Sequence, residues 1–256
     1  TRAKTRFRSG GVPLEMHAAT ELNQRLDAVM RVVYLMFNEG YAASAGDELI
    51  RKDLCFEAIR LSRIISNHPV TSLPKVHALT SLFLFHAARL SARSDDSGEL
   101  LLLAEQDRSL WDREMLTDGL EHFRHSACGD ELTDYHLEAE IASLHALSPD
   151  YESTDWTGIL RCYYKLQARK FSPVVELNRI VVMGKIHGTE KALAELTGLA
   201  GNFLMTSFNL FHITRAHFLA EFGRQDEARI AYQTAERLTK NESVLRFIRK
   251  NIINLK

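Results

Sequence analysis

The sequence predicts an all-α protein of antiparallel helical hairpins, stacked as a solenoid or bundle, on three observations. Apolar residues recur three and four positions apart through most of the 256 residues, which is the spacing of a helix with one buried face. Runs in which apolar and polar residues alternate, as they do in a strand, are missing nearly everywhere. Proline does not continue a helix, and all five prolines stand between periodic runs: Pro13, Pro69, Pro74, Pro149 and Pro173.

The composition is that of an ordinary globular protein, with 45% hydrophobic and 25% charged residues. The formal net charge is -1, so no bulk attraction to nucleic acid or to a membrane surface is expected. No apolar run approaches the length of a membrane span, and no signal peptide opens the chain. The three cysteines lie far apart with no CxxC pair, which favours a reducing cytoplasm over a disulfide framework or a zinc site.

The first long helix is expected over residues 20–43, and its second half is apolar on nearly every side. We therefore expect Val32 and Leu35 to be buried by neighbours on several sides. Asn38 and Glu39 fall in the same stretch, YLMFNEGYAAS, and are expected to be buried there too. A buried carboxylate needs a partner, loses its charge or faces a wet groove. A structural hydrogen bond to the next helix is the favoured interpretation, and a ligand-facing groove is the alternative.

The second helix is expected to begin at Asp47. Glu57 and Arg60 on this helix are candidate partners for the carboxylate of the first helix or for each other. The third helix is expected over residues 75–90, with His86 near its end. A lone histidine on an apolar helix face most often packs in the core, so a ligand role for it is the less favoured interpretation.

A turn and a short extended segment are expected over residues 94–105, where SDDSG precedes four leucines. The acidic turn lacks the oxygen-ligand spacing of an EF-hand, so a solvated turn is expected there instead of a calcium site. The helix that follows carries Trp111, and Ser109 with Asp112 resembles a capping arrangement at its start.

Histidines and acids gather on a helix expected over residues 131–147. His136 and Glu140 share one face of it, but His145 lies off that face, and the HExxH pattern of zinc enzymes is absent. A second histidine pair in the preceding helix, three positions apart, supplies only two ligands. We therefore expect no metal site, and the sequence holds no complete catalytic set or cofactor motif.

Two helix–glycine–helix segments are predicted in the second half of the chain, after a helix capped by Thr154 or Asp155. In residues 172–199 the break is Gly188, and Pro173 suits the first turn of the helix before it. In residues 211–238 the break is Gly223, which suits the left-handed conformation that ends a helix.

Small residues on the 211–238 segment allow its two helices to approach closely. It resembles a tetratricopeptide hairpin, without that pattern's closing proline, and the pattern's small and aromatic positions are filled by Gly223, Ala228, Tyr232 and Ala235. Arg179 and Arg215 lie 36 positions apart (215 minus 179), near the roughly 34 residues of that repeat. The 172–199 segment is therefore interpreted as a second, degenerate hairpin. Asn241 is the expected N-cap of a closing helix.

Seven stretches in order along the chain together resemble one protein family. They are RAKTRF, YLMFNEGYAAS, DLCFEAIRLSR, EQDRSLWD, TDWTGILRCYYKL, SPVVELNRIVV and the terminal hairpin. They are similar to the C-terminal extension of bacterial extracytoplasmic-function RNA polymerase sigma factors of the sigma-70 family, in the group that carries a tetratricopeptide-like domain. The resemblance divides the chain into three parts. Residues 1–16 are a residual tail of an upstream DNA-reading domain, 17–150 the helical N-terminal half of the extension, and 151–256 the hairpins with their closing helix.

The resemblance implies a regulatory role in transcription initiation, with RNA polymerase core and the upstream sigma-factor domains as partners, and a peptide or protein regulator as another. Nearly all of the DNA-reading domain is absent, so DNA contact is expected only through domains outside this chain. The segment 136–147 is more acidic than expected of the family, with Glu138 and Glu140. A groove near it is therefore expected to differ.

The favoured hypothesis is a protein-interaction domain with a concave helical face, and not an enzyme. A small-molecule sensor that uses the same groove is the alternative, and a cytoplasmic hydrolase with Cys55 as its nucleophile is the less favoured one. Several candidates also have structural interpretations, as a helix start for residues 107–108 or as a brace between hairpins for residues 178–179. The candidate groove residues are Asn38, Glu39, Tyr41, Arg89, Asp107, Arg108, Trp111, Asn178 and Arg179.

Overall fold

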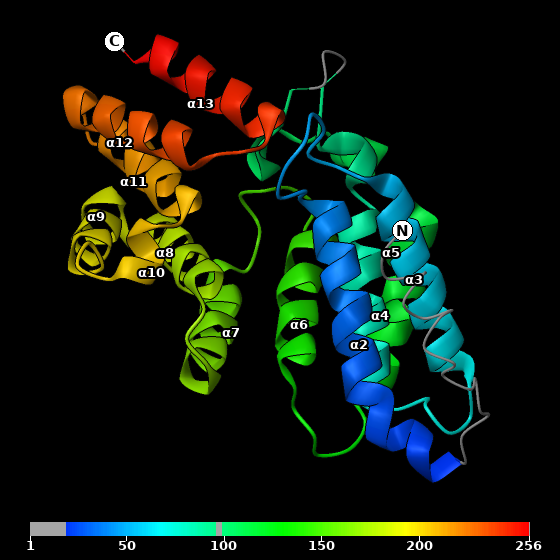
Figure 1. Cartoon of the computed structure of the whole chain (residues 1–256). Coiled ribbons are helices and arrows are strands. Elements are labelled where there is room, and N and C mark those ends of the chain that lie inside the picture. The colour runs from blue at the N-terminus through cyan, green and yellow to red at the C-terminus, as the bar shows by residue number, and fades with distance from the viewer. Residues whose placement is uncertain (1–18, 96–98, 256) are drawn as a thin grey trace, which may run out of the picture.

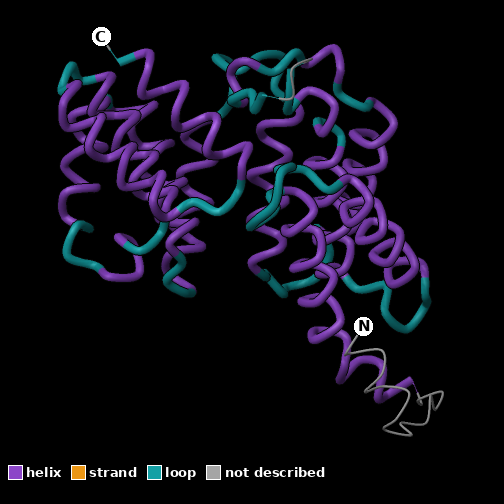
Figure 2. Tube along the Cα trace, turned by 45° about the horizontal axis from the view of Figure 1, so that its top comes forward, coloured by secondary structure: helices purple, strands orange, loops and turns teal. Residues whose placement is uncertain are grey.

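Helices make up most of the part of the chain that the structure describes. The computed structural model describes residues 19–95 and 99–255, and within these ranges it contains twelve α-helices, three short 3₁₀ helices and no strand beyond two isolated bridges (Figures 1 and 2). The predicted all-α class is therefore confirmed. No helix in these ranges has both the length and the hydropathy that crossing a bilayer requires. The predicted tail over residues 1–16 and part of the predicted 94–105 turn lie outside the described residues.

The first half of the molecule is a bundle around a central helix, α4. This helix contacts α2, α3, α5 and α6, and Leu79, Phe83 and Phe85 on it are almost fully buried. Phe83 stacks on Phe37 of α2 with ring centroids 4.3 Å apart. The elements of this half are α2 (Ala19–Tyr41), α3 (Lys52–Asn67), α4 (Pro74–Ala87), η1 (Leu90–Ala92), η2 (Leu103–Glu105), η3 (Arg108–Leu110), α5 (Arg113–Ser126) and α6 (Asp134–Leu147).

The second half forms a separate layer beside the bundle (Figure 1). Its elements are α7 (Trp156–Arg169), α8 (Pro173–His187), α9 (Thr189–Gly198), α10 (Phe203–Thr206), α11 (Asn209–Glu221), α12 (Gln225–Leu238) and α13 (Glu242–Asn254). Gly188 and Gly223 have φ of 92° and 85° between paired helices, as the two helix–glycine–helix predictions require. Ala216, Ala228 and Ala235 are completely buried in the core of this half, so their small side chains allow α11 and α12 to lie close together.

Helix starts follow the predicted capping chemistry at most positions. Pro173 occupies the first turn of α8, and Asp155 caps α7 by accepting a hydrogen bond from the Gly158 amide at 2.8 Å. Asn241 caps α13, where its side-chain oxygen accepts from the amides of Ser243 and Val244. The predicted start of the helix at Ser109 was wrong, since α5 begins at Arg113, after Trp111, and its cap is Asp112, which accepts from the Met115 amide at 2.9 Å.

The predicted burial on α2 was wrong in part. Val32 and Leu35 are 66% and 59% exposed, and Asn38 is exposed as well, while Glu39 is only partly buried. The physical reason is that α3 and α4 cover one face of α2, which places Met30 and its periodic neighbours in the core and leaves the outer apolar positions uncovered by any described element.

The predicted start of the second helix at Asp47 was also wrong, since α3 begins at Lys52. Residues 42–51, between α2 and α3, turn back against the end of α2 instead. The Ala43 amide donates to the Leu49 carbonyl at 2.7 Å, and the Arg51 amide donates to the Gly40 carbonyl at 2.7 Å. These bonds satisfy backbone groups that a helix would otherwise have paired.

The returning segment is also where the last helix meets the first half. The Asn241 side-chain amide donates to the carbonyl oxygens of Ala43 and Glu48 at 3.2 and 3.1 Å, across 198 and 193 positions of sequence. The Glu242 amide donates to the Gly46 carbonyl at 3.0 Å, and the Ser243 hydroxyl donates to the Asp47 carbonyl at 2.9 Å. We call this set of contacts the Asn241 joint. A second contact region between the halves is a core cluster shared by α6, α7 and α8.

Replacing Asn241 tests how much the joint contributes. Asn241→Ala removes a helix cap and two buried hydrogen bonds, so the free energy of unfolding should fall by about 2–3 kcal/mol. Asn241→Ser keeps a capping oxygen but loses the amide donors, so it should restore about 1 kcal/mol of that loss. Denaturant unfolding of the three proteins measures both values. A loss below about 0.5 kcal/mol in Asn241→Ala would mean that the joint does not hold the halves together.

Candidate functional site

A cavity of about 620 Å³ lies between the two halves. One wall comes from the end of α2, from α4 and α6 and from residues 102–104. The opposite wall comes from α7, α8, α11, α12 and α13. The lining is mainly apolar and aromatic, and it includes Phe85, Ile141, Ala142, Ala146, Trp156, Val182, Ile213, Tyr232 and Phe247. Such a cavity with a few convergent polar groups is the usual form of a small-ligand site.

Arginine and tyrosine form the polar corner of this cavity. Arg89, just beyond α4, donates a hydrogen bond from Nη2 to the Tyr41 hydroxyl. Arg93 donates to the Tyr41 carbonyl, and its guanidinium lies 3.7 Å from the Tyr41 ring centroid. Burial alone would raise the pKa of the Tyr41 phenol, but the positive charges of Arg89 and Arg93 lower it below its ordinary value.

Two histidines stand beside this corner and stay neutral. Burial, together with the charges of Arg89 and Arg108, lowers the pKa of His145 to about 4. The pKa of His86 is lowered well below its ordinary value, first by burial and then by Arg89 and Arg93. The positive charge on the cavity wall therefore belongs to the arginine and not to the imidazoles.

Three buried polar atoms around the cavity have no hydrogen-bond partner among the described protein atoms. They are Arg89 Nε, His145 Nδ1 and Trp156 Nε1. The His145 and Trp156 rings meet edge to face with centroids 5.3 Å apart, and Tyr151 lies 4.8 Å from Trp156 on its other side. Buried polar groups of native proteins are nearly always paired, so three such atoms around one cavity indicate a place for polar ligand atoms.

The structure brings three of the predicted groove residues, Tyr41, Arg89 and Asn178, to this cavity. Asn38 and Glu39 lie outside its lining. The Glu39 carboxylate accepts from the Ser44 amide and hydroxyl, both at 3.3 Å, so it closes the turn after α2. Its expected partners on the next helix, Glu57 and Arg60, pair with each other at 2.7 Å.

The predicted residues 107, 108 and 111 lie outside the cavity lining and hold one of its walls, the end of α6, in place. Asp107 caps η3 by accepting from the Ser109 amide at 2.8 Å. Arg108 donates to the carbonyl oxygens of His145 and Ser148 at 2.8 and 2.7 Å, and its guanidinium lies 4.5 Å from the centroid of the buried Trp111 ring. These residues therefore fix the end of α6, including His145.

Arg179 is a structural brace and not a groove residue. Its side chain is 5% exposed and pairs with the buried Glu176 at 2.7 Å and with Glu195 of α9. Gln167 of α7 donates to the same Glu176 at 2.7 Å. The group ties α7, α8 and α9 together.

Sequence reasoning missed several cavity residues. Trp156 was not among the predicted groove residues, and His145 was considered only as a metal ligand. The signal available for His145 was a polar residue in the last turn of its helix, between Leu144 and Ala146. Phe247 and Tyr232 gave no signal, because a lining aromatic residue and a core aromatic residue have the same helical spacing.

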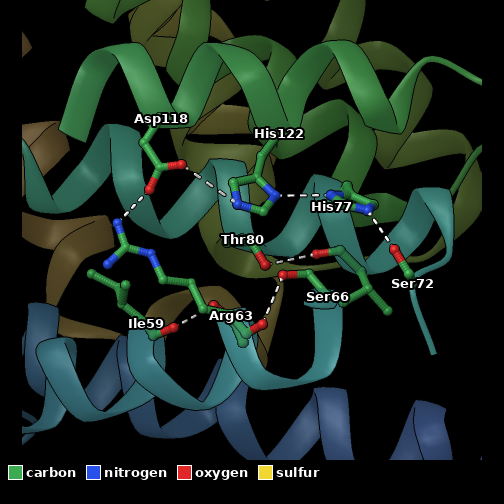
Figure 3. A network of polar contacts seen from close by, with 10 residues as sticks. Ile59, Arg63, Ser66, Ser72, His77, Thr80, Asp118 and His122 are labelled. Carbon is green, nitrogen blue, oxygen red and sulfur yellow. Dashed lines mark hydrogen bonds and ion pairs between the residues drawn. The ribbon is translucent and has the colours of Figure 1, made fainter. Parts of the chain in front are cut away.

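A second polar cluster joins α3, α4 and α5 on the far side of the first bundle (Figure 3). The Nδ1 atoms of His77 and His122 lie 2.8 Å apart, at hydrogen-bond distance, while His122 Nε2 lies 3.7 Å from Asp118, which pairs with Arg63. Burial lowers the pKa of His77 to about 4, together with the neighbouring histidines. No group of three or more histidine, cysteine or acidic residues in the described ranges could hold a metal ion. A broad hollow of about 700 Å³ beside this cluster, on α3, has mostly apolar walls.

Comparison with known proteins gives two matches. Residues 25–127 match a family described as a family of unknown function (DUF6596). The whole chain is 39% identical over 259 residues to Uncharacterized protein R00370 of Rhizobium meliloti (strain 1021), and it spans 60% of the length of that relative. No solved structure matches the chain. The family match includes Tyr41 and Arg89, so it covers the polar corner but not the opposite wall.

Removing Arg179 should destabilise the second half. Arg179→Met leaves two carboxylates without their cation, one of them buried, so the free energy of unfolding should fall by about 3 kcal/mol. Arg224→Met is the matched control, because Arg224 pairs with Glu227 at 2.6 Å on an exposed part of α12. That change should cost less than about 1 kcal/mol. Equal effects in denaturant unfolding would contradict the role of Arg179 as a brace.

Glu138 should make stability depend on pH. Burial raises its pKa to about 7, and its carboxylate accepts a hydrogen bond from the Tyr34 hydroxyl at 2.9 Å. The folded state therefore keeps a proton that the unfolded chain releases near pH 4.5, so this group's contribution to stability falls as pH rises from about 4.5 to about 7. Glu138→Gln should remove that slope and stabilise the protein at pH 8 by on the order of 2 kcal/mol.

Urea unfolding at pH 5 and pH 8 checks this expectation. The exposed Glu190→Gln on α9 controls for the loss of one surface carboxylate. If the wild type and Glu138→Gln lose the same stability between the two pH values, Glu138 does not hold the extra proton.

Proposed function

We propose that this chain is a regulatory, ligand-responsive extension of a bacterial extracytoplasmic-function sigma factor, acting in the cytoplasm, with the cavity between its halves as the ligand site. One observation carries the proposal: helices of both halves build the cavity walls, so a single occupant contacts both. An occupant that binds one arrangement of the halves more tightly shifts the population toward that arrangement.

The size of the cavity favours a small ligand over a large protein surface. Pockets for small ligands typically enclose about 300–1,000 Å³, and this cavity has about 620 Å³. A stable protein interface typically buries roughly 800 Å² on each partner, which is more than the lining of one cavity of this size offers. Within the proposal, the upstream sigma domains and RNA polymerase core respond to the arrangement of the halves, and DNA is contacted only by those upstream domains.

The sigma-factor setting is supported by the order of motifs along the chain, which resembles the extension of that family. This chain spans 60% of the length of the relative in Rhizobium meliloti. We further propose that α8–α9 and α11–α12 are tetratricopeptide-like hairpins, since each pair turns at a glycine with positive φ and α11–α12 packs through small residues.

Thiol-based hydrolysis is the weaker alternative. Burial raises the pKa of Cys55 to about 11 and that of Cys162 to about 12, so neither carries an appreciable thiolate at neutral pH. Both side chains are buried, and neither lines the cavity.

Filling the cavity tests the proposed function. Ala146→Trp on α6 and Thr214→Trp on α11 each place an indole in it from opposite walls. Transcription in vitro by the full-length factor with core polymerase should change by at least about fivefold, in the same direction for both variants, because a permanent occupant fixes one arrangement.

Ala168→Trp is the matched control, because Ala168 is exposed on α7 outside the cavity lining, and transcription with it should remain at the wild-type level. Circular dichroism and Tm establish that each variant is folded. Wild-type transcription from both folded cavity variants would refute the proposal.

A further inference from the structure

We propose that the cavity takes a small ligand with an anionic head, such as a carboxylate, sulfonate or phosphate, on an aromatic or apolar body, and that Arg89 binds the head. This inference rests on the proposed function, because it names the chemical class of the ligand at the same site.

The charge of the cavity wall supports an anionic head. Arg89 is the only arginine or lysine among the described lining residues, and no aspartate or glutamate is present there. Arg93 and Arg108 lie behind the same corner, and in the described part of the chain no ion pair joins any of these three arginines to a carboxylate. An uncompensated guanidinium in a partly desolvated cavity attracts anions and binds them in bidentate fashion.

The three arginines are not equally available. Arg93 is buried and is used on the carbonyl and the ring of Tyr41, while Arg108 is used on the end of α6. One N–H group of Arg89 donates a hydrogen bond to the Tyr41 hydroxyl, and its buried Nε has no partner among the described protein atoms. A guanidinium carries five N–H donors, so Arg89 retains the capacity to bind an oxyanion.

The nearest buried acid does not neutralise this corner. Glu138 points to Tyr34 on the side of α6 that faces α2, and its pKa is about 7, so much of it is protonated at neutral pH. Three histidines line the cavity, and the two beside this corner, His86 and His145, are neutral for the reasons given above, while His217 lies on the opposite wall, on α11. Arg89 is therefore the one permanently charged side chain among the described lining residues.

The remainder of the cavity suits an aromatic or apolar body. Trp156 forms edge contacts with His145 and Tyr151, and Phe85, Tyr232 and Phe247 contribute further apolar surface. The unpaired Trp156 Nε1 and His145 Nδ1 supply polar positions on that side of the cavity. One molecule with a charged end and a flat apolar end satisfies both sets of groups.

A matched pair of fluorescent dyes tests the inference on this chain. The probes are 1-anilinonaphthalene-8-sulfonate and N-phenyl-1-naphthylamine, which share an aromatic skeleton and differ in the sulfonate. Arg89→Gln should weaken binding of the sulfonate dye by about tenfold, since a hydrogen bond to a charged group is lost. The neutral dye should bind both proteins with Kd values within about twofold of each other, because its contacts are apolar.

Control experiments establish that the dyes bind in this cavity and that each variant is folded. Arg224→Gln removes an exposed arginine that lines neither this cavity nor the hollow on α3, and it should leave both dyes unaffected. Phenyl phosphate and phenylacetate, compared with phenylacetamide as competitors of the sulfonate dye, separate phosphate from carboxylate heads. If Arg89→Gln does not fold by circular dichroism, Arg89→Lys keeps the charge without the planar fork, and it should weaken the sulfonate dye and leave the neutral dye unaffected.

The outcomes separate the two proposals. Equal behaviour of the two dyes with Arg89→Gln, together with loss of both from Ala146→Trp, would overturn the anionic head and leave the cavity as a ligand site. Binding of neither dye in the cavity, shown by unchanged titrations with folded Ala146→Trp, would overturn the ligand site itself and with it the proposed function.

Discussion

The contact between the start of α13 and the segment after α2 centres on one side chain, the carboxamide of Asn241. Its oxygen caps α13 and its nitrogen holds the segment that returns after α2, so a single residue fixes a helix start and a contact between distant parts of the chain. The helix cap and the contact with the segment after α2 both bear on the cavity. The joint connects α13 to the end of α2, and these two elements supply Phe247, Asn251 and Tyr41 to the cavity lining. The other contact between the halves that brings buried side chains together is the core cluster of α6, α7 and α8.

Much of the fold could be predicted from the sequence because helix boundaries depend on local chemistry. Pro173, Gly223 and Asn241 act on backbone groups within a few residues of themselves, and the structure has them in the predicted roles. The burial of Val32 and Leu35 could not be predicted, because spacing shows that a helix side is apolar and not whether another element covers it. The contact of Asn241 with the segment after α2 could not be predicted from the sequence either, since its partners there lie almost 200 positions away.

The candidate site was harder to predict than the fold for the same reason. An arginine can either brace two helices or face a ligand. Only the positions of the neighbouring carboxylates show which of the two roles it has. Arg179 has two such neighbours and Arg89 has none in ion-pair contact among the described residues, although both follow apolar helical stretches in the sequence. The aromatic wall depends on helices of the second half, whose placement beside α6 is set by tertiary packing.

The length of chain enclosed by the Asn241 joint has a consequence for how the molecule forms. The first bundle is built from residues close in sequence, whereas the joint pairs residues almost 200 positions apart. During synthesis, the segment after α2 therefore has no such partner until residue 241 has been made. Phe247 and Asn251 of α13 also line the cavity, so a chain that stops before α13 contains every helix of the first bundle but lacks part of the cavity wall.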